Sequence, residues 1–211
     1  MLTLYTAPGT CALASHIALI DAGAEHTIVR VNFKTNEQRT PEYLAVNAKA
    51  RVPSLVTPRG VLTESPAILA YIAQSYPAAK LAPLDDPFAF AEAQAFNSYI
   101  CSTLHINHAH RMRGTRWVEP TDTEALAAMQ RKVPKTVAEC FALIEQTLFK
   151  GPWVLGADYS ICDAYLFTVS QWMEGDSIDP KQFPKIHDHM QRMAERPSVK
   201  QAFAAMSPPK S

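Results

Sequence analysis

Hydrophobic and polar positions change their spacing along the chain, and this change divides it into two parts. Up to about residue 76, short alternating or β-branched runs, typical of strands, take turns with runs at helical spacing. The predicted order is βαβαββα, with strands at 2–5, 27–33, 54–57 and 61–63 and helices at 11–22, from 40 and at 65–76. A strand–helix–strand start predicts a parallel pair, to which the hairpin adds an antiparallel edge.

From residue 88 onward the pattern is helical. Long helices are expected over 88–112, 121–150 and 160–173, and shorter ones from Pro184 and Pro197. Between the two parts, Tyr76 to Pro87 carries three prolines and no helical period, which is typical of a linker. The sequence therefore predicts an α+β domain over 1–77, a linker over 78–87 and an all-helical domain over 88–211.

Several residues are expected to cap or bend these helices. Thr121 and Glu124 have the spacing of a capping box, and Ser160 with Asp163 has a related one. Pro134 lies inside the second long helix and is expected to kink it.

Composition excludes several classes of protein. The 211 residues are 47% hydrophobic and 19% charged, which indicates a globular chain. Twenty basic and twenty acidic side chains give a formal net charge of zero, which argues against non-specific nucleic-acid binding and against an anionic membrane surface. No apolar stretch is long enough to span a membrane, and the first residues do not resemble a signal peptide. The four scattered cysteines indicate reduced thiols in a cytoplasm.

The chain contains no dinucleotide-binding, P-loop, serine-hydrolase or zincin motif. The residues that remain as candidates for chemistry lie mostly in the first domain. Cys11 follows Pro8-Gly9-Thr10 at a helix start, where free N–H groups favour a thiolate; a buried structural cysteine is the alternative. A cis Val52-Pro53 bond would present the Val52 backbone to a peptide-like ligand, whereas a trans bond would make an ordinary turn.

Two further groups allow a functional and a structural interpretation. Glu64-Ser65-Pro66 could bind an α-amino-acid head group, with Ser65 and helix N–H groups on the carboxylate and Glu64 on the ammonium; a plain helix cap is the alternative. Cys101, His105 and His108 share one helix face at spacings that could bind a transition metal, but a partly buried polar stripe is favoured, so no metal is expected.

These residues together resemble the cytosolic glutathione transferases. The resemblance rests on Pro8-Gly9-Thr10-Cys11, Arg51-Val52-Pro53-Ser54, Thr63-Glu64-Ser65-Pro66 and Ser160-Ile-Cys-Asp163, which occur in one order along nearly the whole chain. The cysteine after Pro-Gly is similar to that of the bacterial beta class.

The resemblance implies a thioredoxin-like domain followed by a helical domain, in a homodimer without membrane or nucleic-acid partners. It implies that glutathione is the co-substrate, with Cys11 and His105 at its sulfur and Lys34, Val52, Pro53, Glu64 and Ser65 along its backbone. The pocket for the hydrophobic electrophile would include Met112, Phe167 and Trp172. Ser160 and Asp163 would serve folding. One departure is Ile106, where the family usually has lysine.

The implied activity is conjugation of the glutathione thiolate to hydrophobic electrophiles, a detoxification chemistry, with Cys11 able to form a mixed disulfide with glutathione. Two alternatives stay open. One is a glutathione-dependent thiol–disulfide reductase or peroxidase that uses the same cysteine. The other is a non-catalytic ligand-binding protein, because a fold does not fix a function.

Overall fold

The N-terminal part is a four-stranded sheet with helices, and its element order agrees with the predicted βαβαββα. The computed structural model describes residues 1–206. The elements are β1 (Leu2–Thr6), α1 (Ala12–Asp21), β2 (His26–Arg30), α2 (Pro41–Val46), β3 (Ser54–Thr57), β4 (Gly60–Thr63) and α3 (Ser65–Ser75). The second strand ends earlier than predicted, because the side chain of Asn32 accepts the Lys34 N–H and starts the short 3-10 helix η1 (Phe33–Thr35). A second such helix, η2 (Glu37–Arg39), precedes α2.

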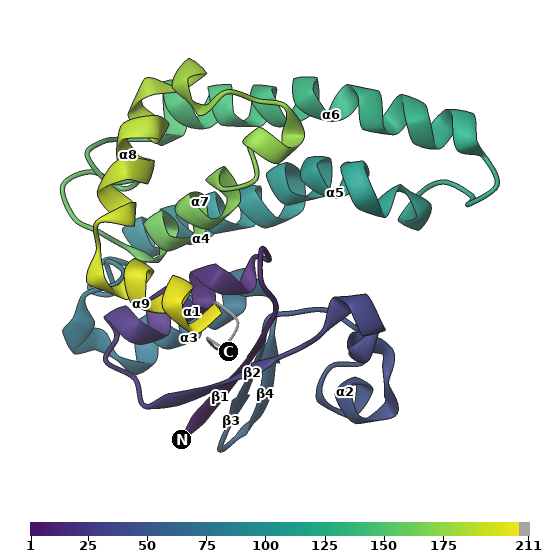
Figure 1. Cartoon of the computed structure of the whole chain (residues 1–211). Helices are drawn as coiled ribbons and strands as arrows, with labels where there is room; N and C mark the ends of the chain where they lie inside the picture. The colour runs from purple at the N-terminus through teal and green to yellow at the C-terminus, as the bar shows by residue number, and fades with distance from the viewer. Residues whose placement is uncertain (207–211) are drawn as a thin grey trace.

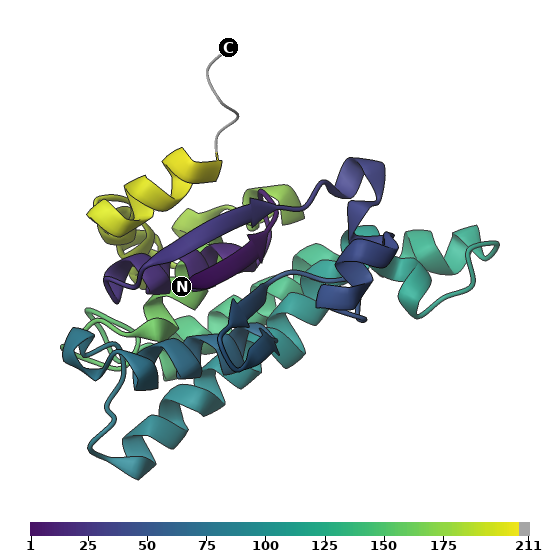
Figure 2. The ribbon, with the colours of Figure 1, turned by 90° about the horizontal axis from the view of Figure 1, so that it is seen from below.

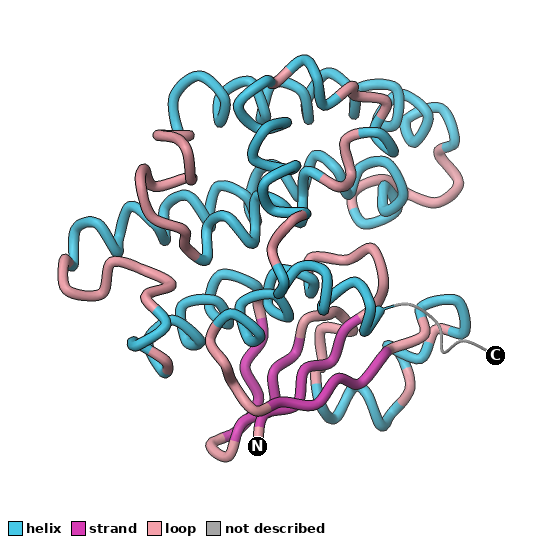
Figure 3. The backbone as a smooth tube through the Cα atoms, turned by 60° about the vertical axis from the view of Figure 1, so that its left-hand side comes forward, coloured by secondary structure: helices cyan, strands magenta, loops and turns pink. Residues whose placement is uncertain are grey.

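The sheet has the strand order β2-β1-β3-β4, in which β1 and β2 are parallel and the other neighbours are antiparallel. Helices α1 and α3 lie between this sheet and the helical domain, as Figures 1 and 3 show. The α2 segment lies to one side of the sheet (Figure 1).

The C-terminal part is helical, as predicted, but its long helices are interrupted. The predicted helix over 88–112 forms α4 (Pro87–Tyr99) and α5 (His105–Arg113), separated by a π-helical turn at Ile100–Leu104. After the short 3-10 helix η5 (Gly114–Arg116) come α6 (Thr123–Leu143), a second π-helical turn (Ile144–Leu148), α7 (Ile161–Ser170), α8 (Pro184–Ala194) and α9 (Pro197–Met206). No helix within residues 1–206 combines the length and apolarity that a membrane crossing needs.

Two helix caps differ from the predicted ones. Helix α6 is capped by Asp122, whose carboxylate accepts the Ala125 N–H at 2.9 Å, so the predicted Thr121–Glu124 capping box does not form. Helix α3 begins at Ser65, and the preceding residue Glu64 takes the N-cap position with a positive φ of 73°. Ser65 is thus the first helical residue rather than the cap.

Helix α1 packs on both domains and is buried over most of its length. All residues from 12 to 19 are buried, because one side of the helix covers the sheet and α3 while another contacts α7. A single core cluster runs from Leu4 and Leu55 of the sheet to Phe141 and Ile161 of the helical domain. The two domains therefore share one hydrophobic core, and the first turn of α1 lies where they meet.

Asp163 stabilises the start of α7 through a fully buried network. Its carboxylate accepts the backbone N–H groups of Val154 and Ser160, both at 2.8 Å, and the Ser160 hydroxyl at 3.0 Å. The same carboxylate pairs with His189 at 3.0 Å, with both side chains inaccessible to solvent. The predicted capping box of Ser160 and Asp163 is confirmed.

We predict that Asp163→Ala lowers the free energy of unfolding by about 3 kcal/mol, because buried donors lose their only charged acceptor. The exposed cap Asp122 is the matched control, and Asp122→Ala is expected to cost only about 1 kcal/mol. Urea denaturation followed by circular dichroism measures both values. Equal losses in the two variants would contradict the role assigned to the buried network.

Candidate functional site

The site begins at the loop between β1 and α1. Gly9 adopts a positive φ of 70°, and the Thr10 hydroxyl donates to the Ala7 carbonyl at 2.6 Å, which closes the loop into a tight turn. This turn places Cys11 at the N-cap of α1, where its side chain makes no capping hydrogen bond. The thiol instead donates to the Val52 carbonyl, with Sγ 3.6 Å from the oxygen.

Burial favours the neutral thiol of Cys11, which is one of the two possibilities that the sequence left open. The residue is 7% exposed. Burial raises the pKa of Cys11 to about 11, although a hydrogen bond from the Ser65 side chain acts in the opposite direction. Desolvation is the largest of these effects, because Cys11 lies in the core that the two domains share. At neutral pH the group is therefore a hydrogen-bond donor.

The Val52 backbone lies at the other side of the Cys11 thiol. The Val52-Pro53 peptide bond is cis, the geometry that the sequence left open. The loop that contains this bond is held in place by two hydrogen bonds to the Arg51 carbonyl. The Tyr43 hydroxyl donates one at 2.6 Å, and the Asn47 side-chain amide donates the other at 2.8 Å. An extended backbone edge is thus held next to the cysteine.

Glu64 and Ser65 form the third side of this region. Ser65 is buried at the start of α3, and its side chain lowers the pKa of Cys11, which places it beside the thiol. The half-exposed Glu64 carboxylate pairs with Lys49 at 2.6 Å, and Lys49 also donates to the Thr63 hydroxyl at 2.8 Å. The sequence reasoning did not identify Lys49, because it lies 15 positions away along the chain.

The helical domain contributes a cluster of three rings. The Trp172 ring stacks on His108, with ring centroids 4.3 Å apart, and contacts the tilted ring of His105 at 4.9 Å. Its indole N–H donates to the Gly9 carbonyl at 3.1 Å and so ties the helical domain to the loop that carries Cys11. His108 is fixed by a 2.7 Å contact between its Nδ1 and the buried carboxylate of Asp176.

His105 is also uncharged at neutral pH. Burial lowers its pKa to about 4, and the neighbouring His108, Arg116 and Arg51 lower it further. A neutral imidazole can still donate one hydrogen bond. No group of three or more potential metal-ligating His, Cys, Asp or Glu side chains occurs among residues 1–206.

An apolar cavity of about 340 Å³ lies beside this cluster of rings. It is lined by Trp172 and Phe203, by Pro8, Gly9 and Thr10 of the β1–α1 loop, and by Leu13 of α1. The other expected pocket residues lie elsewhere. Phe167 is 2% exposed and packs behind Phe203, with ring centroids 6.2 Å apart, and Met112 is 62% exposed on α5. Lys34 is exposed in η1.

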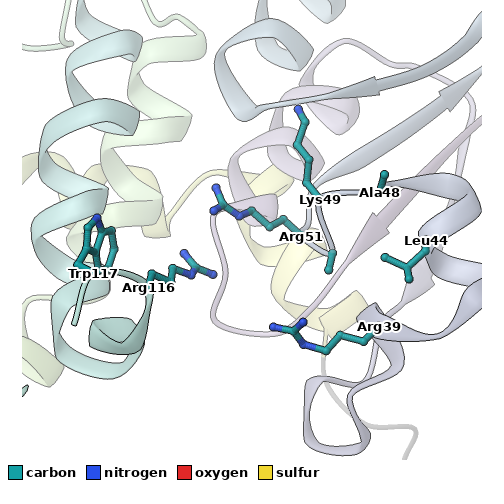
Figure 4. Close-up of a pocket in the computed structure, with 8 residues that line it drawn as sticks. Arg39, Leu44, Ala48, Lys49, Arg51, Arg116 and Trp117 are labelled. Atoms are coloured by element: carbon teal, nitrogen blue, oxygen red, sulfur yellow. The ribbon is translucent and has the colours of Figure 1, made fainter. Parts of the chain in front are cut away.

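A second and larger cleft, of about 520 Å³, opens between the two domains. In Figures 1 and 2 the α2 segment lies opposite the turn between α5 and α6, and Figure 4 shows the side chains that line the space between them. They are Arg39, Leu44, Ala48, Lys49, Ala50, Arg51, Arg116 and Trp117. Sequence reasoning missed this cleft because its charged residues come from separate segments that no motif connects.

Comparisons with known proteins agree with this geometry. Residues 1–74 match the model for the glutathione S-transferase N-terminal domain and residues 90–197 the model for the C-terminal domain. The chain is 34% identical over 205 residues to glutathione S-transferase GstA of Escherichia coli O157:H7, covering 96% of this chain and 97% of that protein.

Two solved structures extend the similarity. A glutathione transferase homologue from Sulfitobacter with bound glutathione is 43% identical, with a TM-score of 0.93 over 97% of this chain and 98% of that one. The bacterial beta class glutathione S-transferase of Sphingomonas chungbukensis is 30% identical, with a TM-score of 0.84 over the same shares of the two chains.

Proposed function

Because the chain belongs to the glutathione S-transferase family, we propose that its site activates the thiol of bound glutathione for attack on hydrophobic electrophiles. The protein is a glutathione transferase, with glutathione as its co-substrate. The observation that carries the finer proposal is the convergence of a neutral Cys11 thiol, the Val52 backbone and Ser65 at one point.

The N-terminal domain would bind glutathione along its whole length. Free N–H groups at the start of α3 and the Ser65 hydroxyl suit the γ-glutamyl carboxylate. Glu64 suits the adjacent ammonium, and its present partner Lys49 would be displaced or shared. The Val52 N–H and carbonyl would pair with the cysteinyl backbone, as in strand addition. Lys34 could reach the glycyl end.

Cys11 would act as a donor to the glutathione sulfur. When the cysteinyl N–H of glutathione bonds to the Val52 carbonyl, the ligand's sulfur lies next to Cys11, whose thiol can turn from that carbonyl to the sulfur. The neutral imidazole of His105 would donate from the other domain. Hydrogen bonds to a charged acceptor favour the ionised form, so both donors would lower the pKa of the bound thiol.

The reaction would then be a displacement or addition at carbon. The glutathione thiol loses its proton to solvent, and its sulfur forms a bond to the electrophilic carbon. In a displacement, the leaving group departs with its bonding electron pair. In an addition, the π electron pair moves away from the attacked carbon, and the resulting anion takes a proton from solvent. Lowering a thiol pKa from about 8.5 to about 6.5 raises the thiolate fraction at pH 7 roughly 25-fold. The thiolate of lower pKa is also a weaker nucleophile, which reduces its rate of attack about eightfold. Positioning of the electrophile must therefore supply most of the rate.

The electrophile would lie against the apolar cavity beside Trp172. Phe167 would support this wall through Phe203 rather than touch the ligand, and Met112 would stay at the rim. This arrangement favours conjugation over the reductase alternative, because disulfide exchange needs a reactive cysteine thiolate, and burial keeps Cys11 protonated.

We predict that Cys11→Ala lowers kcat for conjugation to an aryl halide by about tenfold, the effect of one charge-assisted hydrogen bond. A glutathione-dependent reductase would instead lose all activity in this variant. Steady-state kinetics with the aryl halide and with a mixed-disulfide substrate distinguish the two. Complete loss of conjugation would overturn the donor role of Cys11.

We also predict a slow mixed disulfide at Cys11. Its thiolate attacks one sulfur of oxidised glutathione and releases one reduced glutathione as the leaving thiolate. Since the pKa of Cys11 is about 11, the rate should rise roughly tenfold per pH unit between pH 7 and 9. Intact mass with peptide mapping measures it. A pH-independent rate, or an adduct on Cys101 instead, would contradict the assignment.

Glu64→Gln is expected to raise KM for glutathione about tenfold, because an uncharged amide binds the γ-glutamyl ammonium less tightly. The matched control is Glu25→Gln, which removes an equal charge from an exposed position before β2. Kinetics at varied glutathione concentration measure both variants. An unchanged KM for Glu64→Gln would place the γ-glutamyl end elsewhere.

Two features of the protein's setting complete the proposal. The chain would act as a homodimer. The apolar side chain of Phe88 in α4 supports this, because it is 75% exposed in the single chain. Light scattering should then give a molar mass of twice 23.3 kDa. It would work in the cytoplasm, which suits four cysteines that are all free. A monomeric mass at assay concentration would contradict the first statement.

A further inference from the structure

The large cleft between the domains is lined by four cationic side chains from three separate segments. Arg39 comes from η2, Lys49 and Arg51 from the loop before β3, and Arg116 from η5 of the helical domain. In Figure 4 the side chains of Arg51 and Arg116 extend toward one another across the cleft, and Arg39 points into the same space. Trp117 adds an aromatic surface to the wall.

Most of this positive charge is not compensated by the protein. Lys49 pairs with Glu64 at 2.6 Å, but Arg39, Arg51 and Arg116 form no ion pair with any of residues 1–206. Burial lowers the pKa of Arg116, and so do the guanidinium groups of Arg51, Arg113 and Arg39. Because the whole chain has a formal net charge of zero, this is a local concentration of like charge.

Glutathione alone does not neutralise the cleft. Its γ-glutamyl carboxylate is assigned to the start of α3, and its ammonium to Glu64. The glycyl carboxylate, which Lys34 could reach, can balance at most one of the three unpaired guanidinium groups. At least two positive charges then stay without a partner in a cleft whose Arg51 and Arg116 both lower the pKa of His105.

We propose that this cleft binds an anionic group of the second substrate, so that the enzyme prefers electrophiles that carry a carboxylate. The inference rests on the proposed function, and it adds a substrate class to it. Guanidinium groups suit the planar geometry of a carboxylate, which they can bind through two parallel hydrogen bonds. The apolar body of the electrophile would stay against the cavity beside Trp172, and the Trp117 ring would contact only the end that carries the carboxylate.

The test uses two stable conjugates that share the tripeptide and differ only in the acceptor part. They are S-(para-carboxybenzyl)glutathione and its neutral isostere S-(para-carbamoylbenzyl)glutathione. Calorimetry measures the affinity of each for the full chain, the Arg116→Gln variant and the Arg59→Gln variant. Arg59 is the matched control, since it is exposed in the β3–β4 hairpin and does not line the cleft.

The wild-type chain is expected to bind the carboxylate about tenfold more tightly than the amide at low salt, the effect of one charge-assisted hydrogen bond. Arg116→Gln should reduce this ratio to about two or less, whereas Arg59→Gln should leave it intact. High salt should also reduce the ratio, because the Debye length falls from about 30 Å at 0.01 M to about 3 Å at 1 M.

Three results would overturn the inference. Equal affinity of the two conjugates for the wild-type chain would show that the cleft does not recognise the acceptor's charge, while leaving the glutathione transferase assignment in place. A constant ratio in Arg116→Gln, with both conjugates weakened, would mean that this arginine binds the glycyl carboxylate of glutathione itself. Failure of both conjugates to bind would instead refute the proposed glutathione site on which the inference rests.

Discussion

The enclosure of α1 between the sheet and α7 is the constraint on which the site depends. Every residue from 12 to 19 of this helix is buried, and both domains contribute to the core around it. Cys11 stands at the first turn and is buried with the helix, so its thiol stays protonated and serves as a donor. The same packing brings Trp172 of the helical domain within hydrogen-bond distance of Gly9, in the loop before that turn. The reacting region therefore exists only when the two domains are packed together.

The two domains supply different chemistry to this junction. The N-terminal domain offers backbone groups at Val52, a helix start at Ser65 and the Glu64 carboxylate, all of which suit a peptide-like ligand. The helical domain offers rings, and with Arg116 it also offers charge. The side chains proposed to contact the glutathione sulfur, Cys11 and His105, are uncharged, whereas the guanidinium groups line the cleft between the domains. This separation would allow the thiolate to form among hydrogen-bond donors while charge selects the second substrate.

Much of the fold could be read from the sequence, because it is encoded locally. Alternating and helical spacings gave the element order, and Ser160 with Asp163 marked a helix start that the structure confirms. The ionisation of Cys11 could not be read in the same way. Position at a helix start favours a thiolate, but burial by residues over a hundred positions away decides the outcome. The Lys49–Glu64 pair and the cationic cleft were missed for the same reason, since each joins segments that are distant in the chain.

The ionisation of bound glutathione tests the central claim most directly. Glutathione labelled with carbon-13 at the cysteinyl Cβ can be titrated by NMR, free and bound to the protein, because the shift of that carbon follows the charge on sulfur. If Cys11 and His105 donate to the sulfur, the bound thiol should ionise at least about one pH unit below the free value of about 8.5, and Cys11→Ala should reverse part of that shift. Equal pKa values for free and bound glutathione would contradict the proposed site.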